Sequence, residues 1–318
     1  MTRNIPGEFL RRPVRVLVVG CGGNCSAIIA GLPYLHQAMI VRGHPGGLDV
    51  TLMDGDLVAP TNCIRQPFSQ SEIGHSKAVI LASRVNLFWN LNWHGIPHHL
   101  SARTNLDRVD IVVGCVDSRG ARKLIAEKTS GQRSAVYYWL DLGNHATGGQ
   151  FVLGQPWNWA NRRSAARLRT VAELFPELID ASLDDDRQPS CSAVEALERQ
   201  EPFVNPTLAN HALALLAKLF RHGSIEHHGA FVNVAGSRVQ PLIADIFAAL
   251  IRLWLRGVAD LAEVQFFWPL WSLLDHPAFL QRKRRCWVEL DFVSCANEAA
   301  DETAQLQPIL TGKPASRR

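Results

Sequence analysis

The stretch VRVLVVGCGGNC, residues 14–25, decides the fold that this sequence predicts. Its first part is rich in valine and bounded by glycine, a pattern that is typical of a β-strand. Gly20, Gly22 and Gly23 follow at once, where the backbone has to turn tightly and leave room for a phosphate at the N-terminus of the next helix. The stretch therefore predicts a strand–turn–helix unit that binds a phosphate-containing ligand.

The glycine pattern alone leaves the chemistry open, since dehydrogenases, methyltransferases and adenylating enzymes share it. Position 25 is more often a third glycine, and Cys25 instead brings a side chain toward the contact between the helix and the sheet. The small residues Ala27, Ala30 and Gly31 predict a helix that lies close on the sheet. We expect the unit to form with a cysteine at position 25.

A second strand, predicted at residues 48–53, ends in a loop with several polar side chains. Two carboxylates, two cations and two amides at the carboxyl end of a strand are suited to bind a ribose, a triphosphate and its metal ion. A solvated polar loop is the alternative explanation for any single residue, but it explains the whole set poorly. The set comprises Asp54, Asp56, Asn62, Arg65, Gln66 and Lys77.

Asp117 occupies a similar place after another predicted strand, the continuous apolar run at residues 110–116. An acid at the carboxyl end of a strand, facing the same crevice as the glycine turn, is well placed to hold a magnesium ion with nucleotide phosphates. The alternative is that Asp117 caps the helix predicted at residues 120–129. The residue alone does not separate the two interpretations.

The remaining patterns complete an α/β protein of the Rossmann-like type, with a mixed, mostly parallel sheet flanked by helices. Other predicted helices lie at 78–91, at 205–223, where Asn205 and Pro206 would open the helix, and at a segment ending near 178 that contains Arg162, Arg163, Arg167 and Arg169. Other predicted strands lie at 96–100, 136–142 and 150–153, and a last hairpin, expected to cover one sheet edge, at 229–234 and 238–242.

Two domains are expected. Residues 1–245 form the nucleotide-binding domain, with an irregular crossover loop at 157–192. Residues 246–318 form a helical, aromatic-rich extension that either packs on its own domain or docks a partner. Its tail, from residue 297 onward, is expected to be mobile.

Composition excludes several classes of function. The chain has 318 residues, 47% of them hydrophobic, and a net charge of +4, which is too slight to indicate nucleic acid binding. Its seven cysteines contain no C-x-x-C pair, so neither a disulfide framework nor structural zinc is predicted. No signal peptide is evident, and Asp245, Arg252 and Arg256 interrupt the longest apolar segment. We expect a cytoplasmic protein without a membrane span.

The order of the motifs resembles that of the ThiF/MoeB/HesA superfamily of ubiquitin-activating-type enzymes. The Asn/Arg/Gln and Gly/Lys motifs are its most specific part. Within the superfamily, the chain is most similar to the ThiF-family member of the PRTRC cassettes carried by plasmids and genomic islands. The similarity runs from Val14 to Pro241 and includes the glycine turn, Asp54-x-Asp56, Asn62-x-x-Arg65-Gln66, Gly74-x-x-Lys77 and a strand ending in Val116-Asp117-x-x-x-x-Arg122.

The resemblance implies an enzyme that uses ATP and Mg²⁺ to adenylate the C-terminal carboxylate of a small ubiquitin-like or sulfur-carrier-like protein. It implies that Asp54 binds the ribose and that Asp117 holds the magnesium ion. Arg65 and Lys77 would supply the fixed cations that a reaction between two negatively charged groups requires. The residues implied to face the phosphates are Asn62, Arg65, Gln66 and Lys77.

Cys191 is the candidate nucleophile for a subsequent transfer step. Ser192 and Glu195 have the spacing of a capping box, so Cys191 would precede a helix N-terminus, whose dipole favours a thiolate. The resemblance implies a transfer cysteine before a corresponding helix, although some family members adenylate without one. An unreactive loop cysteine is the alternative.

The resemblance also implies a homodimer in which an arginine, here Arg11 or Arg12, is lent to the neighbouring site. Two other functions stay open: a nucleotide-binding interaction module without turnover, and an NAD-dependent oxidoreductase. The oxidoreductase would need only the glycines and one ribose acid, which leaves the Asn/Arg/Gln/Lys set without a task.

Overall fold

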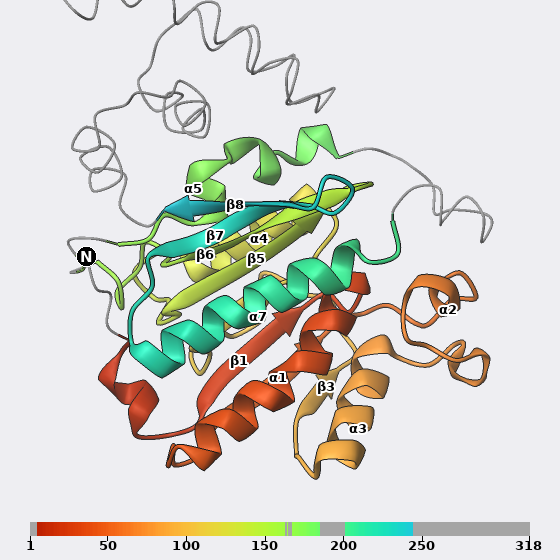
Figure 1. The fold of residues 1–318 in the computed structure, drawn as a ribbon, viewed down its shortest axis with the longest axis horizontal. Helices are drawn as coiled ribbons and strands as arrows, with labels where there is room; N and C mark the ends of the chain where they lie inside the picture. Colours follow the sequence, from red (N-terminus) through yellow and green to blue (C-terminus); the bar gives the residue numbers. More distant parts are fainter. Residues whose placement is uncertain (1–4, 163, 165–166, 185–200, 244–318) are drawn as a thin grey trace, which may run out of the picture. The chain divides into compact units, whose positions relative to one another are not determined.

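The computed structural model describes residues 5–162, 164, 167–184 and 201–243. Eight strands form one sheet in the order β3-β2-β1-β4-β5-β6-β7-β8 (Figure 1). Neighbouring strands from β3 to β5 in this order pair in parallel, whereas the pairs β5–β6, β6–β7 and β7–β8 are antiparallel. The strands are β1 (Val14–Val19), β2 (Leu48–Met53), β3 (His94–Ile96), β4 (Ile111–Gly114), β5 (Tyr138–Asn144), β6 (Gly148–Gly154), β7 (His227–Asn233) and β8 (Arg238–Ile243).

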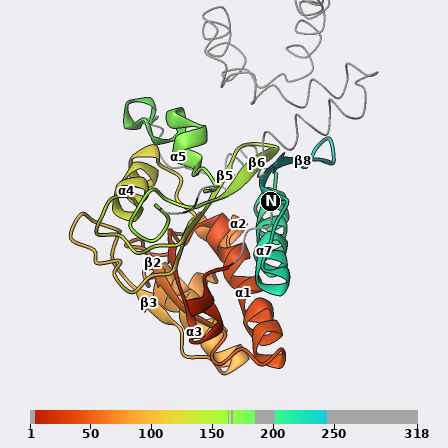
Figure 2. The ribbon, with the colours of Figure 1, turned by 90° about the vertical axis from the view of Figure 1, so that its left-hand side faces the viewer.

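The predicted fold class is confirmed: the sheet is mixed, mostly parallel and covered by helices on both faces (Figure 2). One face packs against α1, α3 and α7, and the other against α4 and α5. The last hairpin is also confirmed, since β8 forms one edge of the sheet. The helices are α1 (Gly23–Val41), α2 (Asn62–Arg65), α3 (Lys77–Trp89), α4 (Arg119–Thr129), α5 (Val171–Leu174) and α7 (Val204–His222), with short 3₁₀ turns at Gly7–Leu10, Gln70–Glu72, Pro176–Ile179 and Ala181–Leu183.

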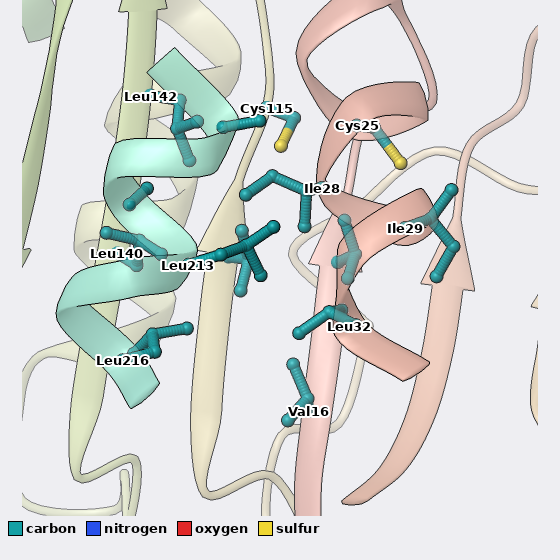
Figure 3. Packing of buried hydrophobic residues seen from close by; sticks show 14 of the residues in the cluster. Val16, Cys25, Ile28, Ile29, Leu32, Cys115, Leu140, Leu142, Leu213 and Leu216 are labelled. Carbon is teal, nitrogen blue, oxygen red and sulfur yellow. The ribbon is translucent and has the colours of Figure 1, made fainter. Parts of the chain in front are cut away.

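The larger core lies between the sheet and the pair α1 and α7 (Figure 3). Ile28 of α1 and Leu213 of α7 point toward each other over the strands. A Cβ atom at Gly31 would lie 2.3 Å from Leu213 Cδ1, so this glycine permits the close approach of α7. The prediction that the small residues of α1 face the sheet is therefore wrong for Gly31, and also for Ala30, which is exposed.

Three predicted elements differ from the structure. The strand expected at 96–100 ends at Ile96, because Pro97 has no N–H for the ladder. No helix spans the described residues between 157 and 170; α5 begins only where Thr170 and Glu173 form a capping box. Helix α7 begins one residue before Asn205, whose side chain makes a tertiary contact and does not cap the helix.

The proposed domain boundary, the later part of the crossover loop and the C-terminal extension concern residues 185–200 and 244–318, which lie outside the described residues. Among the helices that the structure describes, none has the length and apolar character needed to cross a membrane.

Candidate nucleotide-binding site

The glycine turn connects β1 to α1 at the carboxyl end of the parallel strands. Gly20 has a φ of +86°, and a Cβ atom there would lie 2.9 Å from the carbonyl oxygen of Cys115 in the neighbouring chain segment. Gly22 precedes the first residue of α1, and a Cβ atom there would meet no atom within 4 Å. The turn is therefore tight beside β4 but open in front of the helix N-terminus, where an anion is favoured.

The side chain of Asp54, the residue after β2, connects the end of this strand to the glycine turn through hydrogen bonds. Its Oδ2 accepts a hydrogen bond from the backbone N–H of Cys21 at 2.5 Å, and its Oδ1 accepts one from the N–H of Asp56 at 2.7 Å. The side chain is buried, with the residue only 6% exposed. Asp54 thus fixes the position of the glycine turn, whatever further contact it makes with a ligand.

Lys77 lies at the start of α3 and reaches the same loop. Its Nζ is 3.0 Å from Asp56 Oδ2, and its backbone N–H donates to the carbonyl of Asp56. Lys77 is 7% exposed, whereas the Asp56 side chain is half exposed. A buried ammonium held by a single carboxylate is a positioned cation. The glycine turn, Asp54, Asp56 and Lys77 therefore form one connected chain of hydrogen bonds.

His99 joins this group from the loop after β3, and no sequence pattern indicated it. Its Nε2 is 3.7 Å from Asp56 Oδ1, and its ring lies where a Cβ atom of Gly55 would be, 2.4 Å from Cδ2. Asp54, Asp56 and His99 have ligand atoms within 4.8 Å of one another. Since the Lys77 ammonium already neutralises Asp56, this trio is poorly suited to a divalent cation.

The two predicted amides belong to the segment around α2. Asn62 Oδ1 accepts a hydrogen bond from the N–H of Ala59 at 2.8 Å, so it stabilises the local turn. Gln66 Oε1 is buried and has no hydrogen-bond partner among the described residues. A buried amide oxygen without a partner is costly unless a ligand or water contacts it. The side chain of Arg65 lies outside what the structure describes.

Asp117 follows β4 and is exposed at the same end of the sheet as the glycine turn. The N-cap of α4 is Ser118, whose Oγ accepts from the N–H of Ala121. The alternative role of Asp117 as the cap is therefore wrong. The first two amides of α4, those of Arg119 and Gly120, donate to Asp184 instead.

A buried ion pair supports the loop that carries Asp117. Arg122 Nε lies 3.0 and 3.1 Å from the two carboxylate oxygens of Asp141. Burial raises the pKa of the Asp141 carboxyl, while Arg122 acts in the opposite direction. Arg122 also donates to the carbonyl oxygen of Val116, the residue before Asp117. Arg122, the last residue of the motif that begins with Val116 and Asp117, thus stabilises the loop after β4 in this chain.

The cysteines near the glycine turn are buried thiols. A hydrogen bond with Cys25 and then burial raise the pKa of Cys21, and burial raises the pKa of Cys115. These groups stay protonated and do not act as nucleophiles. Cys191, the predicted nucleophile, lies outside the described residues.

Arg12 is occupied at the opposite end of the sheet. Its guanidinium donates to both oxygens of Asp110 at 2.6 and 2.9 Å, and Arg15 binds the same carboxylate. Asp110 precedes β4, whereas the glycine turn follows the carboxyl end of β1. In this structure Arg12 is thus bound to a carboxylate of its own chain.

Together, the parallel half-sheet, the glycine turn and the connected carboxylate and lysine define a Rossmann-like nucleotide-binding protein. Residues 9–137 match the model of the ThiF family. This part of the chain, less than half of the 318 residues, is therefore similar to a ThiF family domain.

Two kinds of relative accompany this match. "Adenylyltransferase and sulfurtransferase uba4" of Aspergillus terreus is 33% identical over 132 residues, which are 39% of this chain and 24% of the relative. The crystal structure of PaaA has a TM-score of 0.50 to this chain at 17% sequence identity. The match covers 74% of this chain and 65% of the PaaA chain. E. coli MccB with ATP has a TM-score of 0.48 at 17% identity, with the same coverage. The chain thus spans about a quarter of the curated relative's length.

Proposed function

We propose that this protein uses ATP and Mg²⁺ to adenylate the C-terminal carboxylate of a small ubiquitin-like or sulfur-carrier-like protein. The observation that carries the proposal is the hydrogen-bonded chain from the glycine turn through Asp54 and Asp56 to Lys77. A ThiF family domain surrounds it, and the name of the uba4 relative includes adenylyltransferase activity.

The residues fit a nucleoside triphosphate. The open space before Gly22 and the first amides of α1 suit a phosphate. Asp54, at the carboxyl end of β2, is assigned to the ribose, and the Gln66 oxygen, which has no partner among the described residues, is a further polar group for the ligand. Asp117 would hold Mg²⁺, which would neutralise phosphate charge. Asp56 and Asn62 are assigned to the surroundings of the phosphates and not to the metal ion.

In the proposed reaction, an oxygen of the partner's carboxylate forms a bond to the α-phosphorus of ATP, and the bond to pyrophosphate breaks. Both reactants are anionic, so the step requires cations that need no reorganisation. Lys77 is held in place by Asp56 before any ligand arrives. Arg65 is assigned as the second cation.

A transfer step to Cys191 is the second part of the proposal. The thiolate would attack the acyl-adenylate carbonyl, forming a thioester and releasing AMP. The sulfurtransferase activity in the name of the uba4 relative is compatible with such sulfur chemistry. Trapping a partner-linked species that is lost in Cys191→Ala, but not in Cys63→Ala, tests this step.

We further propose a cytoplasmic homodimer of the PRTRC-associated type, with a catalytic domain up to residue 245. Size-exclusion chromatography with light scattering tests the dimer. If Arg12 stays bound to Asp110, Arg11 is the remaining candidate for an arginine that acts on the neighbouring site.

ATP–pyrophosphate exchange with candidate C-terminal peptides tests the adenylation itself. Exchange that requires both ATP and a free peptide carboxylate supports it. ATP binding without exchange, for every peptide, would favour a nucleotide-binding module without turnover. Retention of NAD in place of ATP in the purified protein would favour an oxidoreductase.

A further inference from the structure

The loop after β6, residues 155–162, exposes two large aromatic side chains. Trp157 is 60% exposed and Trp159 is 58% exposed. This loop lies at the amino end of β5, because β6 runs antiparallel to β5 and Gly154 pairs with Trp139. It is therefore at the opposite end of the sheet from the glycine turn and takes no part in the proposed reaction.

Buried amides hold this loop in one conformation. Asn158 Nδ2 donates to the carbonyl oxygens of Thr129 and Val136 at 2.9 and 2.7 Å. Asn161 Nδ2 donates to the carbonyl of Pro156 at 3.0 Å, and both asparagines are almost completely buried. The two asparagines thus point inward and the tryptophans outward. A surface that is ordered before binding loses little entropy when a partner docks.

Trp157 is further fixed by a cation. The guanidinium of Arg167 lies over its ring, 5.4 Å from the centroid, and also binds the carboxylate of Glu173 and the carbonyl of Gln155. Tryptophan and arginine are the side chains most enriched among residues that dominate binding energy in protein interfaces.

The charge of the region indicates the chemistry of a partner. Residues 131–169 contain five arginines and a single carboxylate, Asp141, which is buried against Arg122. Glu173, just beyond this range, is paired with Arg167. Arg133, Arg162 and Arg169 are exposed. A second copy of this chain would bring like charges together around a two-fold axis, and the net charge of +4 is small for binding a polyanion.

We propose that Trp157, Trp159 and the exposed arginines form a docking surface for an acidic segment of a partner protein. Carboxylates of that segment pair with the arginines, and its apolar side chains pack on the tryptophan rings. Such a partner binds without competing with a nucleotide at the glycine turn. The proposal goes beyond adenylation and does not depend on it.

The test uses a short fluorescein-labelled peptide of alternating glutamate and leucine, with anisotropy measured on the full chain at low salt. We expect saturable binding that the double variant Trp157→Ala/Trp159→Ala weakens about tenfold or more. Phe88→Ala removes an aromatic residue of α3 that is even more exposed, at 81%, and is the control, with unchanged binding. Saturating ATP should leave the peptide affinity unchanged.

Charge reversal provides a second variant that spares the core. Arg162→Glu/Arg169→Glu should abolish peptide binding, whereas Arg42→Glu, at the exposed end of α1, should not. Four results would overturn the proposal: no binding by the wild-type chain, equal binding by the variants, preferential binding of an oligothymidine probe, or a dimer that dissociates when the tryptophans are removed.

Discussion

The two ends of the parallel half-sheet use polar groups in opposite ways. At the amino end, Asp110 is saturated by Arg12 and Arg15, and Asn158 is saturated by backbone carbonyls. At the carboxyl end, the space before Gly22 is open, Gln66 Oε1 is buried without a described partner and Asp117 is exposed. The polar groups named at the amino end are paired within the chain, whereas those at the carboxyl end are incompletely paired among the described residues, as the proposed ligand site requires.

Lys77 and Arg12 make the same contrast for cations. Each is bound to a carboxylate, but Asp110 is buried and receives four hydrogen bonds from two arginine side chains, while the Asp56 side chain is half exposed and holds one ammonium. An incoming phosphate can recruit Lys77 without leaving a buried charge unpaired. Recruitment of Arg12 would instead remove one of the two arginines that pair with the buried carboxylate of Asp110, which is costly. This difference can be tested by substitution.

The largest effect is expected at Lys77. Lys77→Met keeps the buried aliphatic chain but removes the cation, so the transition state should lose about 2–4 kcal/mol. ATP–pyrophosphate exchange measures this loss, and Lys218→Ala, a partly exposed lysine of α7, is the control. An unchanged exchange rate in Lys77→Met would show that this end of the sheet is not the reaction site.

At the amino end, Asp110→Asn should cost about 2 kcal/mol of unfolding free energy and leave nucleotide binding unchanged. Burial by itself would raise the pKa of the Asp110 carboxyl. The hydrogen bonds from Arg12 and Arg15 together lower this pKa by more than burial raises it, so the net shift is downward. The ion network is therefore fully stabilising above the unfolded pKa of about 4, and its contribution is lost as the pH falls toward the folded pKa.

Thermal unfolding as a function of pH measures this contribution. The wild-type melting temperature should fall more steeply than that of Asp110→Asn as the pH drops below about 4. Parallel curves would mean that Arg12 and Arg15 do not stabilise the charged form.

A pair of glycine substitutions separates stability from ligand binding. The added methyl group of Gly22→Ala meets no described atom within 4 Å, so it should leave the melting temperature unchanged but weaken ATP binding about tenfold, or about 1.4 kcal/mol. Gly20→Ala, at a φ of +86° and against Cys115, should instead lower the melting temperature. Equal ATP affinity in wild type and Gly22→Ala would place the phosphates elsewhere.

The smallest effect is expected where a helix end is capped by a residue distant in sequence. Asp184 accepts from the amides of Arg119 and Gly120, and Asp184→Ala should cost about 1 kcal/mol of stability. Chemical denaturation measures it, with Glu177→Ala as a surface control. A loss no larger than that of the control would mean that this cap forms only weakly in solution.

The sequence predicted β1 and β4 because both lie in largely apolar runs that are followed by a glycine or an acid. It also predicted the glycine turn, where only a residue that tolerates positive φ fits beside Cys115. The hairpin of β7 and β8 was predicted from the two strand-like segments at 229–234 and 238–242. These features are local, so a single sequence contains them.

Features that depend on tertiary contacts were missed. His99 reaches Asp56 across 43 residues, and no spacing rule links them. The arginine-rich segment after β6 contains residues that commonly form helices, but Asn158 and Asn161 bind backbone carbonyls and hold it as a loop. The start of α7 was misplaced because Asn205 serves Asn144 and not the helix end.

The central claim is that the hydrogen-bonded chain from the glycine turn to Lys77 forms a nucleoside triphosphate site. Isothermal titration of ATP and of adenosine, each with Mg²⁺, into wild-type protein and Lys77→Met tests it directly. The account predicts that wild type binds ATP more tightly than adenosine and that Lys77→Met removes this preference while still binding adenosine. Equal affinity for ATP and adenosine in the wild-type protein, or no ATP binding at all, would contradict it.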